Sequence, residues 1–382
     1  MTQGADAPVP DAAVRKGKVF ITGSGRCGEC HVKMYDEWEV SGHADAASST
    51  FYKTSVASAK DPTCDRCHAP LAAESPGDVV ASEGVTCDVC HTLREPVPSK
   101  DGGSWKLAVD DMVKYGPRCD LKDHYFHRMG CSPEHDKAEL CGSCHWWEPK
   151  GIPVFTEYAD WKAGPQAAQG MQCQTCHMPD EKAPLAEGSP VRTGVPHHGL
   201  LGLAADLRKR ALGLDVTVSK VSPGDRLAAA IVIKNNNAGH AVPAGLPERR
   251  IVVRLTLKNV EGNVVATETR ALGRKLVDAQ GAETPFWKAA RVDSDTRIAV
   301  GSEWTETIEL PSVTGGMLDV DVVYRGIADA IAKQLGITEI EEHPMAHASI
   351  KLAGALPKSV HVKPPPPGKR DPKAEKKKKK AP

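Results

Sequence analysis

Aromatic residues are scarce in this chain of 382 residues, in which Phe, Tyr and Trp together make up only 5%. A chain of this length has room for two domains. Aromatic side chains normally supply much of the buried apolar surface of a domain. We therefore expect a large, flat, apolar cofactor to fill part of the interior.

Long apolar runs are also missing. No stretch approaches the roughly 20 apolar residues that span a bilayer as a helix. The N-terminal sequence MTQGADAPVPDAAVRKG lacks the apolar core of a secretory signal. Neither a spanning segment nor an export signal is therefore expected within this chain.

Cysteine is absent after position 176, whereas all 12 cysteines lie between Cys27 and Cys176. This asymmetry predicts a domain boundary. The formal net charge is zero, but from Lys358 onward ten Lys or Arg residues accompany only Asp371 and Glu375, so this part carries +8. The ending PPPPGKRDPKAEKKKKKAP predicts disorder. It can serve as a solubilising tail or adhere to an anionic membrane surface or an acidic partner, and no nucleic-acid partner is expected.

Ten of the cysteines form five copies of CxxCH, the attachment signature of c-type haem. Thiols three positions apart lie on one side of a helical turn and can form thioethers with the two vinyl groups of one porphyrin. The next residue then offers its imidazole to the iron as the proximal ligand. The sequence thus predicts five haem c groups at Cys27, Cys30 and His31; Cys64, Cys67 and His68; Cys87, Cys90 and His91; Cys141, Cys144 and His145; and Cys173, Cys176 and His177.

Two other interpretations of these motifs are weaker. Zinc knuckles pair their CxxC units, and five is an odd number. A thioredoxin-like CxxC would occur once, within a βαβ pattern that the sequence lacks. The remaining Cys119 and Cys131 bracket a loop, for which a disulfide is expected in an oxidising compartment and two unrelated thiols are the alternative.

An electron-transfer haem usually has a second axial ligand, either His or Met. Residues 31–43 are predicted to form a helix. At 1.5 Å per residue, this helix would place His43 roughly 18 Å from His31, so His43 would serve a different iron. Met178 is expected to pack rather than to bind.

The segments CGECHVKMYDEWEVSGHADA, CDRCHAPLA, EGVTCDVCH, AELCGSCH and EYADWKAGPQAAQGMQCQTCHMP resemble the multihaem cytochromes related to the tetrahaem cytochrome and hydroxylamine oxidoreductase of ammonia oxidisers. The resemblance covers roughly residues 20 to 205. It implies packed haems held by loops, mostly with two His ligands each. It also implies distal ligands at His43, His127 and His198, with His124, His135 and His197 as competitors.

The pattern changes from about residue 207 to short β-type runs, at 214–219, 227–234, 251–257, 264–270, 296–300, 305–310 and 318–324, followed by a helix at 328–335. Seven alternating strands suggest an immunoglobulin-like β-sandwich.

The loop 235–250 contains a GHxxPxG sequence that resembles a loop of multihaem cytochromes with a C-terminal sandwich. The resemblance implies that His240 caps an iron. Pro344 disfavours a helix joining His343 and His347, which are expected to face solvent, although one of them remains an alternative fifth distal ligand.

We therefore expect a loop- and helix-rich multihaem cytochrome c domain followed by an immunoglobulin-like β-sandwich. The expected division is a flexible segment at 1–19, a pentahaem domain at 20–205, the sandwich at 206–355 and a disordered tail at 356–382.

The expected function is electron transfer in respiration, between redox protein partners or with a quinol-oxidising complex. The surplus of histidines favours irons with both axial positions filled. A haem enzyme acting on nitrogen or sulfur oxyanions at one open iron, and a subunit of an extracellular cytochrome filament, are the alternatives. Haem attachment implies the periplasm or cell exterior, so the missing export signal suggests a mature chain or a misplaced start codon.

Overall fold

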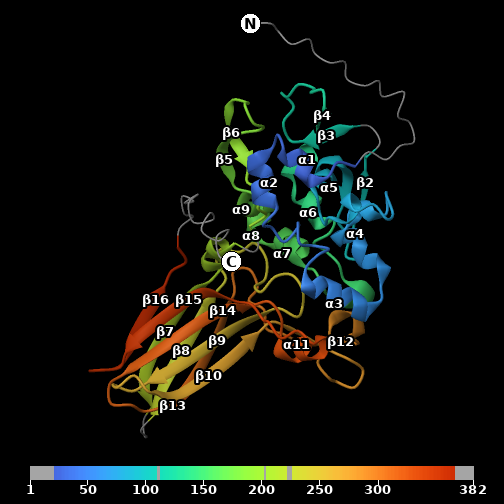
Figure 1. The fold of residues 1–382 in the computed structure, drawn as a ribbon. Helices are drawn as coiled ribbons and strands as arrows, with labels where there is room; N and C mark the ends of the chain where they lie inside the picture. Colours follow the sequence, from blue (N-terminus) through green and yellow to red (C-terminus); the bar gives the residue numbers. More distant parts are fainter. Residues whose placement is uncertain (1–20, 110–111, 202–203, 222–225, 366–382) are drawn as a thin grey trace.

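The computed structural model describes residues 21–109, 112–201, 204–221 and 226–365. The flexible segment predicted at 1–19 and the last 17 residues of the predicted tail lie outside these ranges. Figure 1 shows the cysteine-rich part as short helices and turns set against one end of two large sheets. No helix in the described ranges combines the length and apolarity needed to cross a bilayer.

The cysteine-rich part consists of short elements joined by long connections. Among its described residues, no α-helix exceeds the ten residues of α3, and the strands form three two-stranded pairs, β1–β2, β3–β4 and β5–β6. The elements are α1 (Ser24–Gly28), α2 (Val32–Trp38), α3 (Thr50–Ala59), α4 (Asp65–His68), α5 (Cys87–Thr92), β1 (Leu93–Val97), β2 (Ser104–Leu107), β3 (Val113–Gly116), β4 (Arg128–Cys131), α6 (Ala138–Gly142), α7 (Glu157–Ala163), α8 (Pro165–Ala168), α9 (Cys173–His177), β5 (Asp180–Pro184) and β6 (Val191–Pro196).

Every CxxCH motif begins, contains or overlaps one of these short helices. Side-chain hydrogen bonds cap the N-termini of two of these helices. The Thr86 hydroxyl accepts from the backbone N–H of Val89 in α5, and Gln172 and Thr175 form a reciprocal capping box at α9. The helix predicted over 31–43 is shorter than expected. α2 ends at Trp38, and a turn then leads to His43.

The C-terminal part contains two four-stranded antiparallel sheets, ordered β10-β9-β14-β15 and β13-β8-β7-β16. A short pair, β11–β12, and the helix α11 lie beside them (Figure 1). The elements are α10 (Ala205–Ala211), β7 (Gly213–Val221), β8 (Arg226–Lys234), β9 (Arg250–Lys258), β10 (Val264–Leu272), β11 (Arg274–Val277), β12 (Arg291–Asp295), β13 (Glu303–Pro311), β14 (Met317–Arg325), α11 (Asp329–Leu335), β15 (Glu342–Lys351) and β16 (Lys358–Val362).

One aliphatic core joins the two sheets. β7 and β8 alternate between buried and partly exposed residues, as strands with one face in a core do. The buried side chains of both sheets belong to a single cluster that includes Ile231, Leu255 and Leu318. The sheets therefore pack face to face.

Two sequence predictions are wrong in detail. The run 296–300 is not a strand, since only Ile298 forms a bridge, with Val242. The region predicted to end at residue 355 continues through β16, which pairs with β7. Pro344 lies in β15 at an irregularity of its pairing with β14, so no helix joins His343 and His347, as expected, and the segment is an edge strand, where proline is tolerated.

We expect Leu255→Ala to lower the free energy of unfolding by about 2–5 kcal/mol, because it leaves a cavity in a well-packed core. Leu255 is fully buried. The control, Val265→Ala on the exposed face of β10, should change it by less than about 0.5 kcal/mol. Urea unfolding followed by far-ultraviolet circular dichroism measures both. Equal effects would contradict the shared core.

Candidate cofactor-binding site

A single cavity of about 2640 Å³ runs through the cysteine-rich part and is lined by the cysteines and histidine of all five motifs. Small-molecule sites usually occupy about 300–1,000 Å³, so this cavity has room for several large ligands. His43, His127, His198 and His240 also line it. The structure thus brings every predicted haem-binding residue to one continuous space.

Four of the five proximal histidines face a second histidine at one recurring distance. Two imidazoles on opposite faces of one iron, each about 2 Å from the metal, have ring centroids about 6 Å apart. The observed centroid distances are 6.3 Å for His31–His127, 6.0 Å for His43–His145, 6.3 Å for His91–His198 and 6.2 Å for His177–His240. The rings present therefore fit haem iron with two axial ligands.

Backbone carbonyls orient most of these rings. The Nδ1 atoms of His31, His68 and His91 lie 2.6, 2.8 and 2.6 Å from the carbonyl oxygens of Leu185, Ala46 and Tyr115. An Nδ1–H that donates to a carbonyl leaves the Nε2 lone pair for a metal. His127, His198 and His240 have the same kind of contact, at 3.3, 2.8 and 3.0 Å.

Burial favours the neutral form of His43, His91 and His177, which is the form that binds a metal. Burial, followed by neighbouring imidazoles, lowers the pKa of His43 and His91 to about 3 and that of His177 to about 4. The cavity is therefore electrostatically suited to imidazole ligands at neutral pH.

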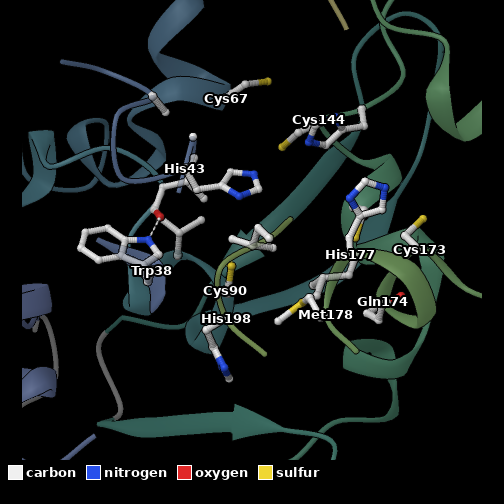
Figure 2. A pocket seen from close by; sticks show the side chains of 18 of the residues that line it. Trp38, His43, Cys67, Cys90, Cys144, Cys173, Gln174, His177, Met178 and His198 are labelled. Carbon is white, nitrogen blue, oxygen red and sulfur yellow. Dashed lines mark hydrogen bonds between the residues drawn. The ribbon is translucent and has the colours of Figure 1, made fainter. Parts of the chain in front are cut away.

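His43 is held by a close backbone approach to the segment before the third motif. The N–H of Val85 donates to the His43 carbonyl at 3.0 Å. The indole N–H of Trp38 donates to the Val85 carbonyl at 2.9 Å, drawn as the dashed line in Figure 2. Gly84 has a φ of +107°, and a Cβ there would lie 2.7 Å from the His43 carbonyl oxygen. Only glycine suits this position.

His127 lies on a loop closed by the Cys119–Cys131 disulfide, as the sequence predicted. Strand β4, which follows His127, pairs in parallel with β3. Tyr125 and Phe126 stand about half exposed beside it, with ring centroids 4.3 Å apart.

A partly buried cluster of charged side chains holds His198. The N–H of His198 donates to Glu37 at 2.8 Å, and Glu37 also pairs with Lys33, which contacts Glu181 at 2.5 Å. His197 contacts Glu37 through Nε2 at 3.1 Å, while its Nδ1 accepts from the Gly199 N–H at 2.9 Å. Both ring nitrogens of His197 are therefore engaged within the protein, which leaves its neighbour His198 as the ligand candidate.

The loop between β8 and β9 carries His240 to the cavity. Helix α7 holds this loop by two hydrogen bonds. Glu157 accepts from the N–H of Gly245, and Asp160 accepts from the N–H of Ala241 at 3.2 Å. Inside the loop, the buried Asn235 side chain donates to the carbonyls of His240 and Ile298, both at 2.9 Å. The C-terminal part thereby places a histidine opposite His177.

His68 differs from the other four proximal histidines. Its ring stacks on Tyr52 with centroids 4.3 Å apart, and the Tyr52 hydroxyl donates to Asp65 at 2.5 Å. A ring in face-to-face contact lies beside the imidazole rather than across an iron from it. Within the described ranges, no second histidine faces His68 at the distance found for the other pairs.

The remaining histidines have other partners. His135 lies 5.6 Å from His91, but its Nε2 contacts the carbonyl of Cys90 at 3.0 Å. His124 is exposed, and its ring packs at a tilt against Tyr125. His343 and His347 contact Glu341 and Asp321 at the surface, as expected for histidines facing solvent.

Thiols of different motifs lie close together. The thiols of Cys27 and Cys87, of Cys67 and Cys144, and of Cys141 and Cys173 are near enough to shift one another's pKa. These neighbouring thiols and burial raise the pKa of Cys141 and Cys144, and the electrostatic influence of Cys90 raises both further. The fourth motif therefore adjoins the second, third and fifth.

The arrangement does not suit zinc. Within the described residues, the one group of His, Cys, Asp and Glu atoms close enough to share an ion is Glu37, Glu181 and His197, and it includes no motif cysteine. The Lys33 ammonium already contacts both carboxylates, so a cationic side chain already occupies the position between them.

Comparison with known proteins agrees with this geometry. Residues 26–92, which contain the first three motifs, match the family model described as cytochrome c554 and c-prime. The fold is similar to that of a penta-heme cytochrome c552 from Thermochromatium tepidum, with a TM-score of 0.69 and 22% identity over 87% of this chain and 99% of the other. A putative beta-galactosidase from Bacteroides fragilis aligns with a TM-score of only 0.19 and 14% identity, over 37% of this chain and 16% of that one. No curated protein matches. The chain therefore has a multihaem cytochrome fold.

Gly84→Ala should displace His43 and destabilise the haem-loaded protein by about 1–3 kcal/mol, since it adds a steric clash to an unfavourable positive φ. Gly77→Ala is the matched control, because Gly77 has a φ of +82° but open space around its Cβ position. Thermal unfolding and the Soret absorption of both variants measure the difference. Indistinguishable variants would show that Gly84 does not position His43.

Proposed function

We propose that this chain is a c-type cytochrome that binds five haems and transfers electrons between redox partners in respiration. The observation that carries the proposal is the set of four facing imidazole pairs in a cavity lined by all five motifs. When bound, haem iron takes up and releases single electrons. An iron with histidine on both faces has no open position for a substrate, which favours a carrier over an enzyme.

The chain's own residues would do three things in this function. Cysteines fix each macrocycle covalently, and carbonyl-oriented imidazoles set each ligand plane. Thiols of different motifs lie near one another, which keeps the binding sites close together. Loops rather than long helices line the cavity, so the interior is made by the cofactors and the turns that surround them.

The Cys119–Cys131 disulfide supports a periplasmic or extracellular location, because disulfides persist in oxidising compartments. There we infer a redox protein or a quinol-oxidising complex as partner. The two packed sheets support an immunoglobulin-like sandwich that covers one end of the cavity. Assembly into a filament is the alternative that electron microscopy of the purified protein tests.

A second candidate function is ligand binding or oxyanion chemistry at the iron held by His68. It is supported by the contrast between His68 and the four paired histidines. Tyr52 and Asp65 flank this site and form a hydrogen-bonded pair beside the proximal imidazole. Such an iron would be five-coordinate and accessible to small ligands.

The pyridine haemochrome assay and intact mass should give five haems per chain. The double variant Cys173→Ala/Cys176→Ala should retain four, because it removes both thioethers of the fifth site. As a control, Cys119→Ala/Cys131→Ala should retain five. A wild-type chain with fewer than five haems would refute the pentahaem proposal.

Electron paramagnetic resonance of the oxidised protein tests the open site. One high-spin ferric signal is expected from the iron at His68, and cyanide should convert it to a low-spin signal while the other four remain unchanged. A spectrum that is entirely low-spin before cyanide is added would eliminate the second candidate function and leave the carrier alone.

A further inference from the structure

One of the four imidazole pairs has a different orientation from the others. The two rings are nearly parallel in His31–His127, His91–His198 and His177–His240, at 27°, 18° and 28°. In His43–His145 they are crossed at 88°. Because the centroid distance of this pair, 6.0 Å, matches that of the rest, the difference concerns ring rotation and not separation.

Ring rotation has an electronic consequence at an iron. The π orbital of an imidazole interacts with the iron d orbital that lies perpendicular to its ring plane. Parallel rings therefore act on the same d orbital and split the d pair, whereas crossed rings act on both and leave the pair nearly degenerate. Ligand orientation is one of the means by which a protein tunes haem iron.

The crossed pair also lacks the hydrogen bonds that orient the other rings. Each parallel pair has at least one Nδ1 within reach of a backbone carbonyl. Over the described part of the chain, neither the His43 ring nor the His145 ring makes such a hydrogen bond. The His43 backbone N–H donates to Ser41, and the His145 ring makes an edge contact with Phe155 at 6.2 Å.

An Nδ1–H that donates to a carbonyl makes the imidazole more basic, which favours the ferric state of the iron. Without that bond the ferric state is less stabilised, and burial of the charged site acts in the same direction. Crossed rings, missing hydrogen bonds and burial thus all raise the reduction potential of the same centre.

This centre is also central in space. His43 projects into the region between Cys67, Cys90, Cys144 and His177 in Figure 2. The fourth motif lies beside the second, where the thiols of Cys144 and Cys67 shift each other's pKa, and beside the fifth, where those of Cys141 and Cys173 do. The third motif lies near it through Cys90, and all of these cysteines line the same cavity. No other motif has as many neighbouring motifs among the described cysteines.

We propose that the site formed by His43 and His145 is the branch point of the array and its most easily reduced centre, distinguished by crossed axial imidazoles. The proposal rests on the proposed function, since it presumes that the five motifs carry haem. Within that function it assigns one site as the place where electrons collect before they leave through the neighbouring sites.

Electron paramagnetic resonance of the oxidised holoprotein, combined with potentiometric titration, tests the proposal. One low-spin signal with a very large maximum g value is expected from the crossed pair, beside rhombic signals from the parallel pairs. On reductive titration, the large-g signal should disappear first. A spectrum with rhombic low-spin signals only, or a large-g signal that is not the first to disappear, would overturn the proposal.

His43→Met assigns the signal to the residue, because it removes one crossed ring and keeps an axial ligand. It should abolish the large-g signal and leave the rhombic signals in place. The control His127→Met alters a parallel pair and should abolish one rhombic signal only. Persistence of the large-g signal in His43→Met overturns the assignment, and the wild-type titration is decisive even if this variant does not mature.

The pyridine haemochrome assay on the same samples separates this inference from the proposed function. Five haems per chain with rhombic signals alone would refute the crossed pair and leave the pentahaem cytochrome intact. Fewer than five haems would refute the proposed function itself.

Discussion

The distance between facing imidazoles is the constraint on which the proposed cofactor sites depend. Two imidazoles must face each other with centroids about 6 Å apart, and four pairs in this chain do so. Each pair joins segments far apart in the sequence, so it acts as a long-range link. Bound haem would add covalent links through the thiols. Metal binding and folding are coupled in such a system, and the short helices need little stability of their own.

The interiors of the two parts of the chain are built differently. The sheets enclose one aliphatic cluster of Leu, Ile and Val, which needs few aromatic residues. Where the structure describes it, the cysteine-rich part has only small apolar clusters, such as the one around Leu71 and Val89, and a large cavity between its loops. The scarcity of aromatic residues in the sequence therefore has two causes: an aliphatic core between the two sheets, and a second part whose interior suits cofactors.

The sequence was sufficient to predict binding residues whose chemistry depends only on their neighbours in the chain. The CxxCH motifs could be interpreted without a fold, because two thioethers and a proximal ligand need only one helical turn. The pairing of His43 with His145 could not be predicted, because the turn after Trp38 determines the direction of the chain and so the position of His43. The assumed helix over 31–43 overlooked that turn. Strand β16 was missed because a lysine- and proline-rich sequence indicated disorder, whereas pairing with β7 determines its conformation.

The sheets take part in the binding site and are not an appendage. The loop that bears His240 begins at the end of β8 and returns at β9, so its position depends on both sheets. The Asn235 side chain donates a hydrogen bond to the His240 carbonyl inside the loop. Glu157 and Asp160 accept hydrogen bonds from backbone N–H groups of the loop. These carboxylates bind main-chain donors, whose positions depend on the path of the loop and not on its side chains. Loss of the sheet packing would therefore move His240 away from His177, which makes the fifth site the one most sensitive to the stability of the C-terminal part.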